Sequence, residues 1–245
     1  LTRGLSHTFQ DGTRALRGVN FRLKKGEFVL VVGPNGSGKT VFVRHLNALY
    51  RPSAGEVLVA GSSTRTHPSA ARQKEGLVFQ DADSQIVGQT VREDIAFGPQ
   101  NLRLPTDEVE RRVSAAMELL ELNDLADHRP HLLSGGEKRR LAIAGVIAME
   151  PEVLILDEPF SNLDYPGVVQ VLRHVVGLHA AGHTVILVSH DIEKSCAHAG
   201  RLVVFFEGNI VLDGPPAETV PMLEQYGVRV PPDTPRRPEE STWLS

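Results

Sequence analysis

The segment Gly33-Pro34-Asn35-Gly36-Ser37-Gly38-Lys39-Thr40 decides the fold class of this chain. A glycine, four further residues and then Gly-Lys-Thr form the pattern of a phosphate-binding loop, and its flanks agree: the apolar run 28–32 precedes it and a helical pattern follows. Glycines allow backbone N–H groups to converge on phosphate, and a helix N-terminus adds positive partial charge. We expect Lys39 to bind the β- and γ-phosphates and Thr40 to ligate Mg²⁺. A glycine-rich turn that binds nothing leaves these two residue types unexplained.

Strand-like runs recur through the rest of the chain, at residues 29–32, 77–79, 153–156, 184–188 and 202–206. They alternate with helical patterns, which predicts an α/β fold with a mainly parallel, buried sheet. At the start, residues 5–9 and 19–23 flank a turn-rich segment, which predicts an antiparallel hairpin. Strand signals stop between 80 and 134, and residues 108–122 carry one apolar helical face. This middle part is therefore expected to be a helical insertion.

Composition narrows the class of protein. The chain has 245 residues, 41% of them hydrophobic, and a net charge of −4, so it lacks the basic footprint of a nucleic-acid binder. Its single cysteine, Cys196, excludes an internal disulfide and a cysteine-based metal site. No run approaches the roughly 18 to 20 apolar residues that cross a bilayer, and no signal-peptide pattern opens the chain. We expect a cytoplasmic protein whose membrane role, if it has one, comes through a partner.

The apolar run 153–156 ends in two acids, Asp157 and Glu158. Ligands bind at the carboxyl ends of strands in α/β folds. Asp157 is expected to hold Mg²⁺ or its water, and Glu158 to polarise the attacking water. Acidic residues after a strand also serve as helix caps. The pair is therefore evidence for a catalytic site only in combination with the phosphate-binding loop at residues 33–40.

The segment Leu133-Ser134-Gly135-Gly136-Glu137 is the most specific. Ser134 is expected to cap a helix whose free N–H groups face an anion, and an ordinary capping box between Ser134 and Glu137 is an equally good interpretation. Here the chain resembles the ABC ATPase superfamily, whose signature is Leu-Ser-Gly-Gly followed by a polar residue. The resemblance implies an α/β P-loop nucleotide-binding domain with a RecA-like, mainly parallel sheet core, an N-terminal antiparallel β part and a helical subdomain.

The resemblance also implies roles for single residues. Gln80 matches the glutamine that reaches Mg²⁺ and water, and His190 the switch histidine that contacts the γ-phosphate. Asp164 ends a segment that matches the D-loop, with Asn162 where many members carry alanine. Phe9 stands where the family places an aromatic residue on adenine, although a phenylalanine that ends a strand is more often part of the core.

In this family the nucleotide site is completed by a second copy. ATP bound with Mg²⁺ at residues 33–40 of one subunit is covered by Ser134, Gly135 and Gly136 of another, and Asp164 bridges the two. The resemblance therefore implies a second ATPase subunit, either the same chain or a sister ATPase. Hydrolysis removes the γ-phosphate and lets the dimer open.

The segments 76–86, 90–99 and 133–150 resemble the ATPase of energy-coupling-factor (ECF) transporters, which import transition metals such as cobalt and nickel and vitamins such as biotin. In that family a second glutamine, here Gln85 by position, lies at a groove for a coupling helix. The resemblance implies an integral membrane coupling subunit, a substrate-binding membrane subunit and a peripheral place on the cytoplasmic face of the membrane. An amphipathic surface helix without a partner is the alternative interpretation of this segment.

A soluble single-cassette ATPase of the iron–sulfur assembly type is the alternative function, because it is similarly short. DNA-repair and translation members carry coiled coils, zinc modules or two cassettes, which this chain lacks.

Phe160, in place of the usual threonine after Asp-Glu-Pro, departs from the family pattern. We expect an ATP-binding domain at 1–214, with its helical subdomain at roughly 81–150, and a proline-rich tail at 215–245.

Overall fold

The structure, a computed structural model, describes residues 1–230 and 242–244. Six strands form its main sheet, in the order β10-β9-β3-β8-β7-β6. They are β3 (Phe28–Val32), β6 (Glu75–Val78), β7 (Val153–Asp157), β8 (Thr184–Val188), β9 (Arg201–Phe206) and β10 (Asn209–Gly214). Neighbouring strands run parallel except for the β9–β10 pair. The predicted α/β fold with a mainly parallel sheet is confirmed.

A second, antiparallel sheet has the order β2-β1-β4-β5. Its strands are β1 (Thr2–Thr8), β2 (Arg14–Phe21), β4 (Ala54–Val59) and β5 (Ser62–Ser63). The β1–β2 pair is the predicted hairpin. The sequence patterns did not predict β4 and β5, because both strands are short and because β4 pairs with β1, which is distant in the sequence.

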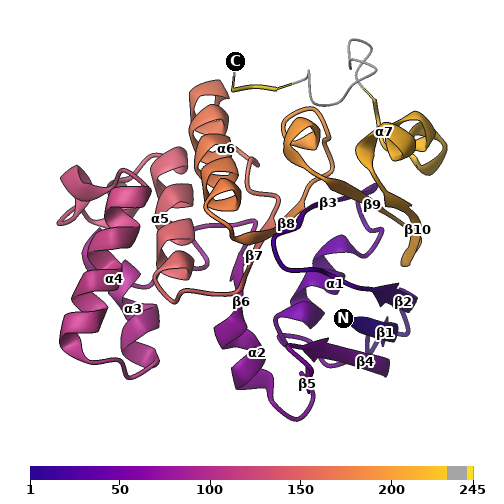
Figure 1. Ribbon diagram of the computed structural model, residues 1–245, viewed down its shortest axis with the longest axis horizontal. Helices are drawn as coiled ribbons and strands as arrows, with labels where there is room; N and C mark the ends of the chain where they lie inside the picture. The colour runs from indigo at the N-terminus through magenta and orange to yellow at the C-terminus, as the bar shows by residue number, and fades with distance from the viewer. Residues whose placement is uncertain (231–241, 245) are drawn as a thin grey trace.

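Alternate side chains of the main sheet face two different layers of helices. Val29 on β3 belongs to one apolar cluster together with Phe42 of α1 (Lys39–Leu46). Its neighbour Leu30 belongs to the other cluster, with Leu141 of α5 (Gly135–Ile147) and Val171 of α6 (Tyr165–Ala180). Because successive residues of a strand point to opposite faces, α1 and the α5–α6 pair cover opposite faces of the sheet (Figure 1).

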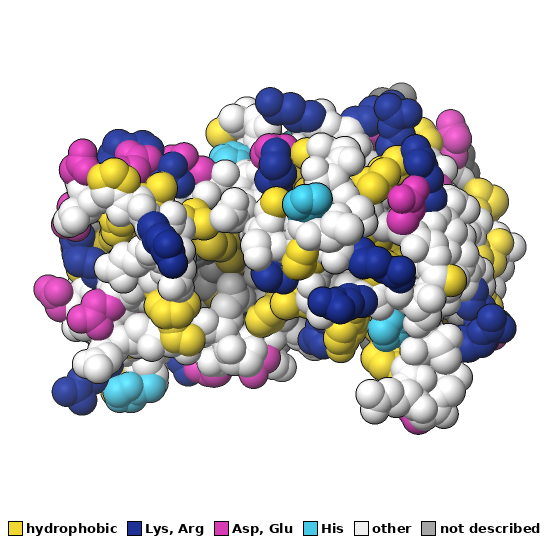
Figure 2. Space-filling model, turned by 90° about the horizontal axis from the view of Figure 1, so that it is seen from below, with side chains coloured by type: hydrophobic (Ala, Val, Ile, Leu, Met, Phe, Trp, Pro, Cys, Tyr) yellow, Lys and Arg dark blue, Asp and Glu magenta, His cyan; other side chains and the backbone are white. Residues whose placement is uncertain are grey.

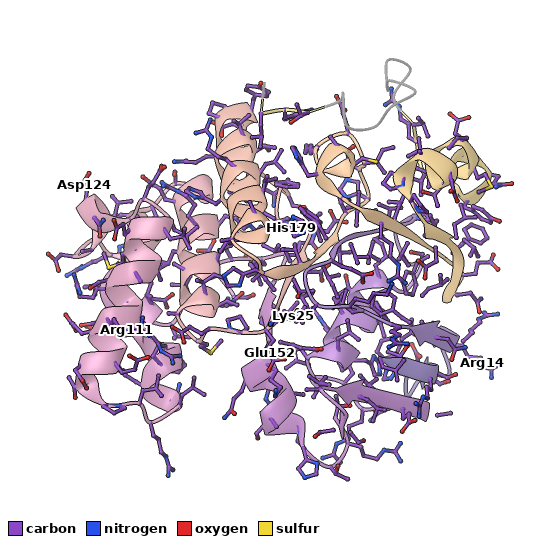
Figure 3. The ribbon with its side chains drawn as sticks, viewed as in Figure 1. Arg14, Lys25, Arg111, Asp124, Glu152 and His179 are labelled. Carbon is purple, nitrogen blue, oxygen red and sulfur yellow. The ribbon has the colours of Figure 1, made fainter. Side chains whose placement is uncertain are left out.

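The predicted helical insertion consists of α3 (Val91–Asn101), α4 (Thr106–Leu119) and α5, with α2 (Pro68–Lys74) between it and β4. Figure 1 shows α3, α4 and α5 gathered at the end of the molecule remote from the antiparallel sheet. Val113 and Met117 of α4 are buried, which confirms the predicted apolar face. Arg111, labelled on α4 in Figure 3, bonds Glu150 at 3.0 Å just beyond α5.

The chain after β10 continues to pack on the core as far as the structure describes it. It forms α7 (Pro216–Thr219) and two 3₁₀ turns, η4 (Val220–Met222) and η5 (Glu224–Tyr226), and Leu223 is fully buried. Residues 231–241 and 245 of the expected tail lie outside the described residues. Near the end, the Trp243 ring lies 5.2 Å from that of Tyr165. The domain boundary at 214 stays a prediction.

Three further 3₁₀ turns complete the fold: η1 (Asn123–Leu125), η2 (Pro130–Leu132) and η3 (Cys196–His198). Cys196 is buried, and burial raises the pKa of its thiol to about 11, as suits an unreactive core residue. Throughout residues 1–230 and 242–244, every helix is too short or too polar to span a bilayer.

Candidate active site

The main sheet brings four separate sequence motifs to one edge. β3, β8, β7 and β6 are adjacent and parallel, so their carboxyl ends lie side by side. The glycine-rich loop follows β3, His190 follows β8, Asp157 and Glu158 end β7, and Gln80 follows β6. A cavity of about 430 Å³ opens there. It is lined by Phe9, Thr13, Arg14, Ala15, residues 35–41, Gln80, Glu158 and His190.

Two glycines allow the loop to pass close to other parts of the backbone. A Cβ atom at Gly33 would overlap the carbonyl oxygen of Phe205 on β9. At Gly38, where φ is +105°, a Cβ atom would lie 2.6 Å from the carbonyl oxygen of Ala15 on β2. Only glycine fits at these positions, so the loop is held between the two sheets with its backbone facing the cavity.

Lys39 is folded back onto the loop. Its Nζ donates hydrogen bonds to the carbonyl oxygens of Gly33 at 2.7 Å and Pro34 at 3.1 Å. Burial lowers the pKa of the ammonium group, and the nearby carboxylates of Glu158 and Asp157 raise it. The carbonyl contacts hold a positive charge next to the cavity, where phosphate oxygens can replace them.

Thr40 and Asp157 meet although 117 positions separate them. The Thr40 hydroxyl donates to Asp157 Oδ1 over 3.2 Å. Burial raises the pKa of Asp157, while the Thr40 hydrogen bond lowers it. A hydroxyl and a buried carboxylate are oxygen donors of the kind that Mg²⁺ prefers, so these residues fit a magnesium ion.

Glu158 is held in position by its backbone. Its N–H donates to the carbonyl oxygen of Val188 at 2.9 Å, and its φ of +50° lies in the left-handed region. Such a conformation is strained for a glutamate and is found where the surrounding structure imposes it. Its carboxylate Oε2 lies 2.9 Å from Nδ1 of His190 and only 10% of its side chain is exposed.

The antiparallel sheet forms the other wall of the cavity. Phe9, at the end of β1, packs edge-on against His7 with 4.6 Å between ring centroids. Thr13 and Arg14 line the cavity as well, and Figure 3 shows Arg14 on the side of the molecule formed by this sheet. The sequence analysis did not identify Thr13 and Arg14. The one signal that could have found them is their position just beyond the turn that follows Phe9.

Ser134, Gly135 and Gly136 lie outside this cavity. Ser134 and Glu137 form a capping box, in which Ser134 Oγ accepts from the Glu137 N–H at 3.3 Å. Gly135 instead lies beside Leu163, and Asp164 caps α6 by accepting from the Gly167 N–H at 3.0 Å. Ser134, Gly135 and Asp164 are exposed. Within one chain the structure therefore brings the signature to Asp164 and not to the glycine-rich loop.

Gln85 lies at a different surface, a groove of about 530 Å³ between α2, α3 and α5. Its amide oxygen accepts from the N–H of Phe79 at 3.0 Å and its amide nitrogen donates to Leu77 O at 3.3 Å. Hydrophobic side chains line much of the groove, and Figure 2 shows a hollow with such side chains beside the helical end. The lining residues include Arg72, Gln73, Gln85, Val87, Phe97, Leu102, Val146 and Met149.

Comparisons with known proteins show what this chain is similar to. Residues 16–161 match the family model described as ABC transporter. The chain is 43% identical over 235 residues to the energy-coupling factor transporter ATP-binding protein EcfA of Methanothermobacter thermautotrophicus, covering 94% of this chain and 76% of that protein. It is 42% identical over 233 residues to the cobalt import ATP-binding protein CbiO of Rhodobacter capsulatus, covering 93% and 83%. The solved structure of cbiO1 from Clostridium perfringens, part of the ABC transporter complex cbiONQ, superposes with a TM-score of 0.82 at 36% identity over 94% of each chain.

Proposed function

Because this chain belongs to the ABC transporter family and is an ATPase of its ECF and CbiO type, we propose that it drives uptake of a transition metal ion or vitamin through separate membrane subunits. One observation carries the proposal. The chain has a nucleotide cavity at the sheet edge and, apart from it, an apolar groove between α2, α3 and α5. The first suits ATP, and the second suits a helix of a membrane partner.

ATP is proposed to bind with its phosphates on residues 33–40. Lys39 Nζ would exchange its carbonyl contacts for the β- and γ-phosphate oxygens, and the N–H groups at the start of α1 would face the same charge. Phe9 lines the cavity and is proposed to stack on the adenine ring. Thr40, Asp157 and Gln80 would hold Mg²⁺, which when bound neutralises charge on the phosphate oxygens.

Glu158 is proposed to accept the proton of the attacking water. Its carboxylate opens into the cavity, and the backbone bond to Val188 keeps it there. His190, beside it, is proposed to turn to the γ-phosphate when ATP is present. Gln80 would orient the same water from the neighbouring strand end.

Ser134, Gly135, Gly136 and Asp164 are proposed to act on the ATP of a second ATPase subunit. They are exposed or half-buried, lie together, and stand apart from the nucleotide cavity of their own chain. The capping box leaves N–H groups of the first turn of α5 without partners inside the helix, so they are free to face a phosphate. ATP would thus hold two subunits together, and its hydrolysis would release them.

The groove near Gln85 is proposed to receive a helix of the integral coupling subunit. Phe97 is 52% exposed in it, and a large exposed apolar side chain in a groove is typical of a docking site. Gln85 ties the groove to the end of β6, next to Gln80. This contact would keep the chain peripheral on the cytoplasmic face of the membrane, with a second membrane subunit binding the cargo.

The relatives with the names given above support an importer over an iron–sulfur assembly ATPase. Affinity purification of the tagged chain from membranes of its source tests this directly. We expect an integral coupling protein and a second, substrate-binding membrane protein to co-purify, and ATP hydrolysis to be coupled to uptake of one cargo. Recovery of a soluble scaffold complex in their place would contradict the importer.

A further inference from the structure

Arg139 lies on α5, five residues after Ser134, and its side chain is enclosed. Only 3% of the residue is exposed. Nη1 donates to the carbonyl oxygen of Phe79 and Nη2 to that of Gln80, each over 2.6 Å. The planar guanidinium thus binds two successive carbonyl groups just beyond the end of β6, a geometry that lysine cannot reproduce.

Burying the Arg139 guanidinium costs free energy. A buried guanidinium loses its hydration, and among the described residues no carboxylate forms an ion pair with Arg139. The negative charges of Asp81 and Asp157 act on the guanidinium without forming an ion pair with it. The Nε atom is buried with no partner in the described structure. The two carbonyl bonds are therefore the main specific contacts of this charge.

The same segment is held at two further points. Lys138, the preceding residue on α5, forms an ion pair with Asp83 at 2.7 Å. Gln85 accepts from the Phe79 N–H at 3.0 Å. The backbone of Gln80 is thereby fixed, while its exposed side chain lines the nucleotide cavity.

We propose that Arg139 is a positioning residue for ATP hydrolysis, which acts by holding the main chain of Gln80 against the helix that begins at the Ser134 signature. The inference rests on the proposed role of Gln80 at Mg²⁺ and water. Since the guanidinium is rigid and enclosed, a displacement of the Gln80 backbone is passed to α5, and one of α5 is passed to Gln80.

Arg140 supplies a matched control on the same helix. It is also a buried arginine, 6% exposed, and its Nη1 donates to two carbonyl oxygens, those of Leu120 at 3.0 Å and Glu121 at 3.1 Å. Those acceptors follow α4 and lie outside the nucleotide cavity. Arg140 thus also donates to carbonyl groups from a buried position, without the contact to Gln80, and differs from Arg139 in a carboxylate oxygen of Glu121 that lies 3.9 Å away.

The experiment is a double-mutant cycle on the full chain. Five variants are compared with the parent: Gln80→Ala, Arg139→Met, Arg140→Met and the double variants that combine Gln80→Ala with each arginine substitution. The measurements are kcat, the Mg²⁺ concentration at half-maximal rate, and ATP binding in EDTA. We expect Arg139→Met to lower kcat by roughly 10- to 100-fold and to raise the Mg²⁺ requirement, because a small misplacement of a positioning group has such effects. ATP binding without Mg²⁺ should change by less than about 2-fold.

In the Gln80→Ala background, Arg139→Met should cost less than about 2-fold further, whereas Arg140→Met should cost the same factor in both backgrounds. Equal factors for Arg139→Met in both backgrounds would overturn the inference. Parent-like kcat in Gln80→Ala would show instead that the proposed role of Gln80 is wrong, and the inference would fall with it. If Arg139→Met does not fold, Arg139→Gln, which retains N–H donors, replaces it in the same cycle.

Discussion

Nδ1 of His190 lies 2.9 Å from Oε2 of Glu158, across the carboxyl ends of the neighbouring strands β7 and β8. The Glu158 N–H also donates to the carbonyl oxygen of Val188 on β8 at 2.9 Å, which joins the ends of the two strands. His190 has 58% of its side chain exposed, whereas Glu158 has only 10%. In the proposed mechanism, the histidine is therefore the member of the pair that would turn to the γ-phosphate.

Glu158→Gln should separate binding from hydrolysis. The amide keeps the shape and the His190 contact but does not accept a proton, so we expect ATP to bind and hydrolysis to fall by about 100-fold or more. ATP-bound dimers should then accumulate, which size-exclusion chromatography with and without ATP measures. Hydrolysis at the parent rate would show that another group is the base.

Phe97→Asp should release the chain from its membrane partner. A carboxylate at this position would lose its hydration once an apolar helix covered the groove. Leu119→Asp is the matched control, because Leu119 is similarly exposed, at 45% against 52%, at the end of α4 outside the groove. The measurement is the amount of integral protein recovered per tagged chain. Equal recovery with both variants would contradict the docking site.

Glu75 should make the stability of the fold depend on pH. It is 7% exposed, its Oε2 has no partner in the described structure, and burial raises its pKa from 4.5 to about 8. Between these values the folded state holds a proton that the unfolded state lacks, so the free energy of unfolding should fall as pH rises, by up to about 1.4 kcal/mol per pH unit.

Glu75→Gln should remove this slope in urea unfolding between about pH 5 and pH 8, the window between the two pKa values. Glu110→Gln is the control, because the side chain of Glu110 is 68% exposed and pairs with Arg92. A slope that survives Glu75→Gln would assign it to other groups.

Trp243 is the only tryptophan and reports on the end of the chain. Its ring lies 5.2 Å from that of Tyr165 and 5.5 Å from Nζ of Lys194. Tyr165→Ala should expose the indole to water and shift its fluorescence to longer wavelength. Tyr226→Ala, which removes a ring that packs on Phe206, should leave the emission unchanged. The same spectrum for all three proteins would show that the contact does not form in solution.

Much of the fold followed from local patterns. The runs that became β3, β7 and β8 are continuous and apolar, as buried parallel strands require, so their places were predictable to within a residue or two. β4, β5 and β10 were not predicted, because their strand conformation depends on pairing with neighbouring strands more than on a pattern in their own residues. Residues 215–230 were placed with the tail for their prolines, and only packing shows that Leu223 is buried.

Sequence alone predicted the residues of the proposed nucleotide site. Gly33, Lys39, Asp157 and His190 lie in short motifs whose conformation depends on neighbours in the chain, and each follows or ends a strand. Tertiary structure alone decided which groups act on one another. Arg139 meets Phe79 and Gln80 across about 60 positions, and Thr40 meets Asp157 across 117. Such contacts arise when separate strands and helices pack, and no local pattern records them.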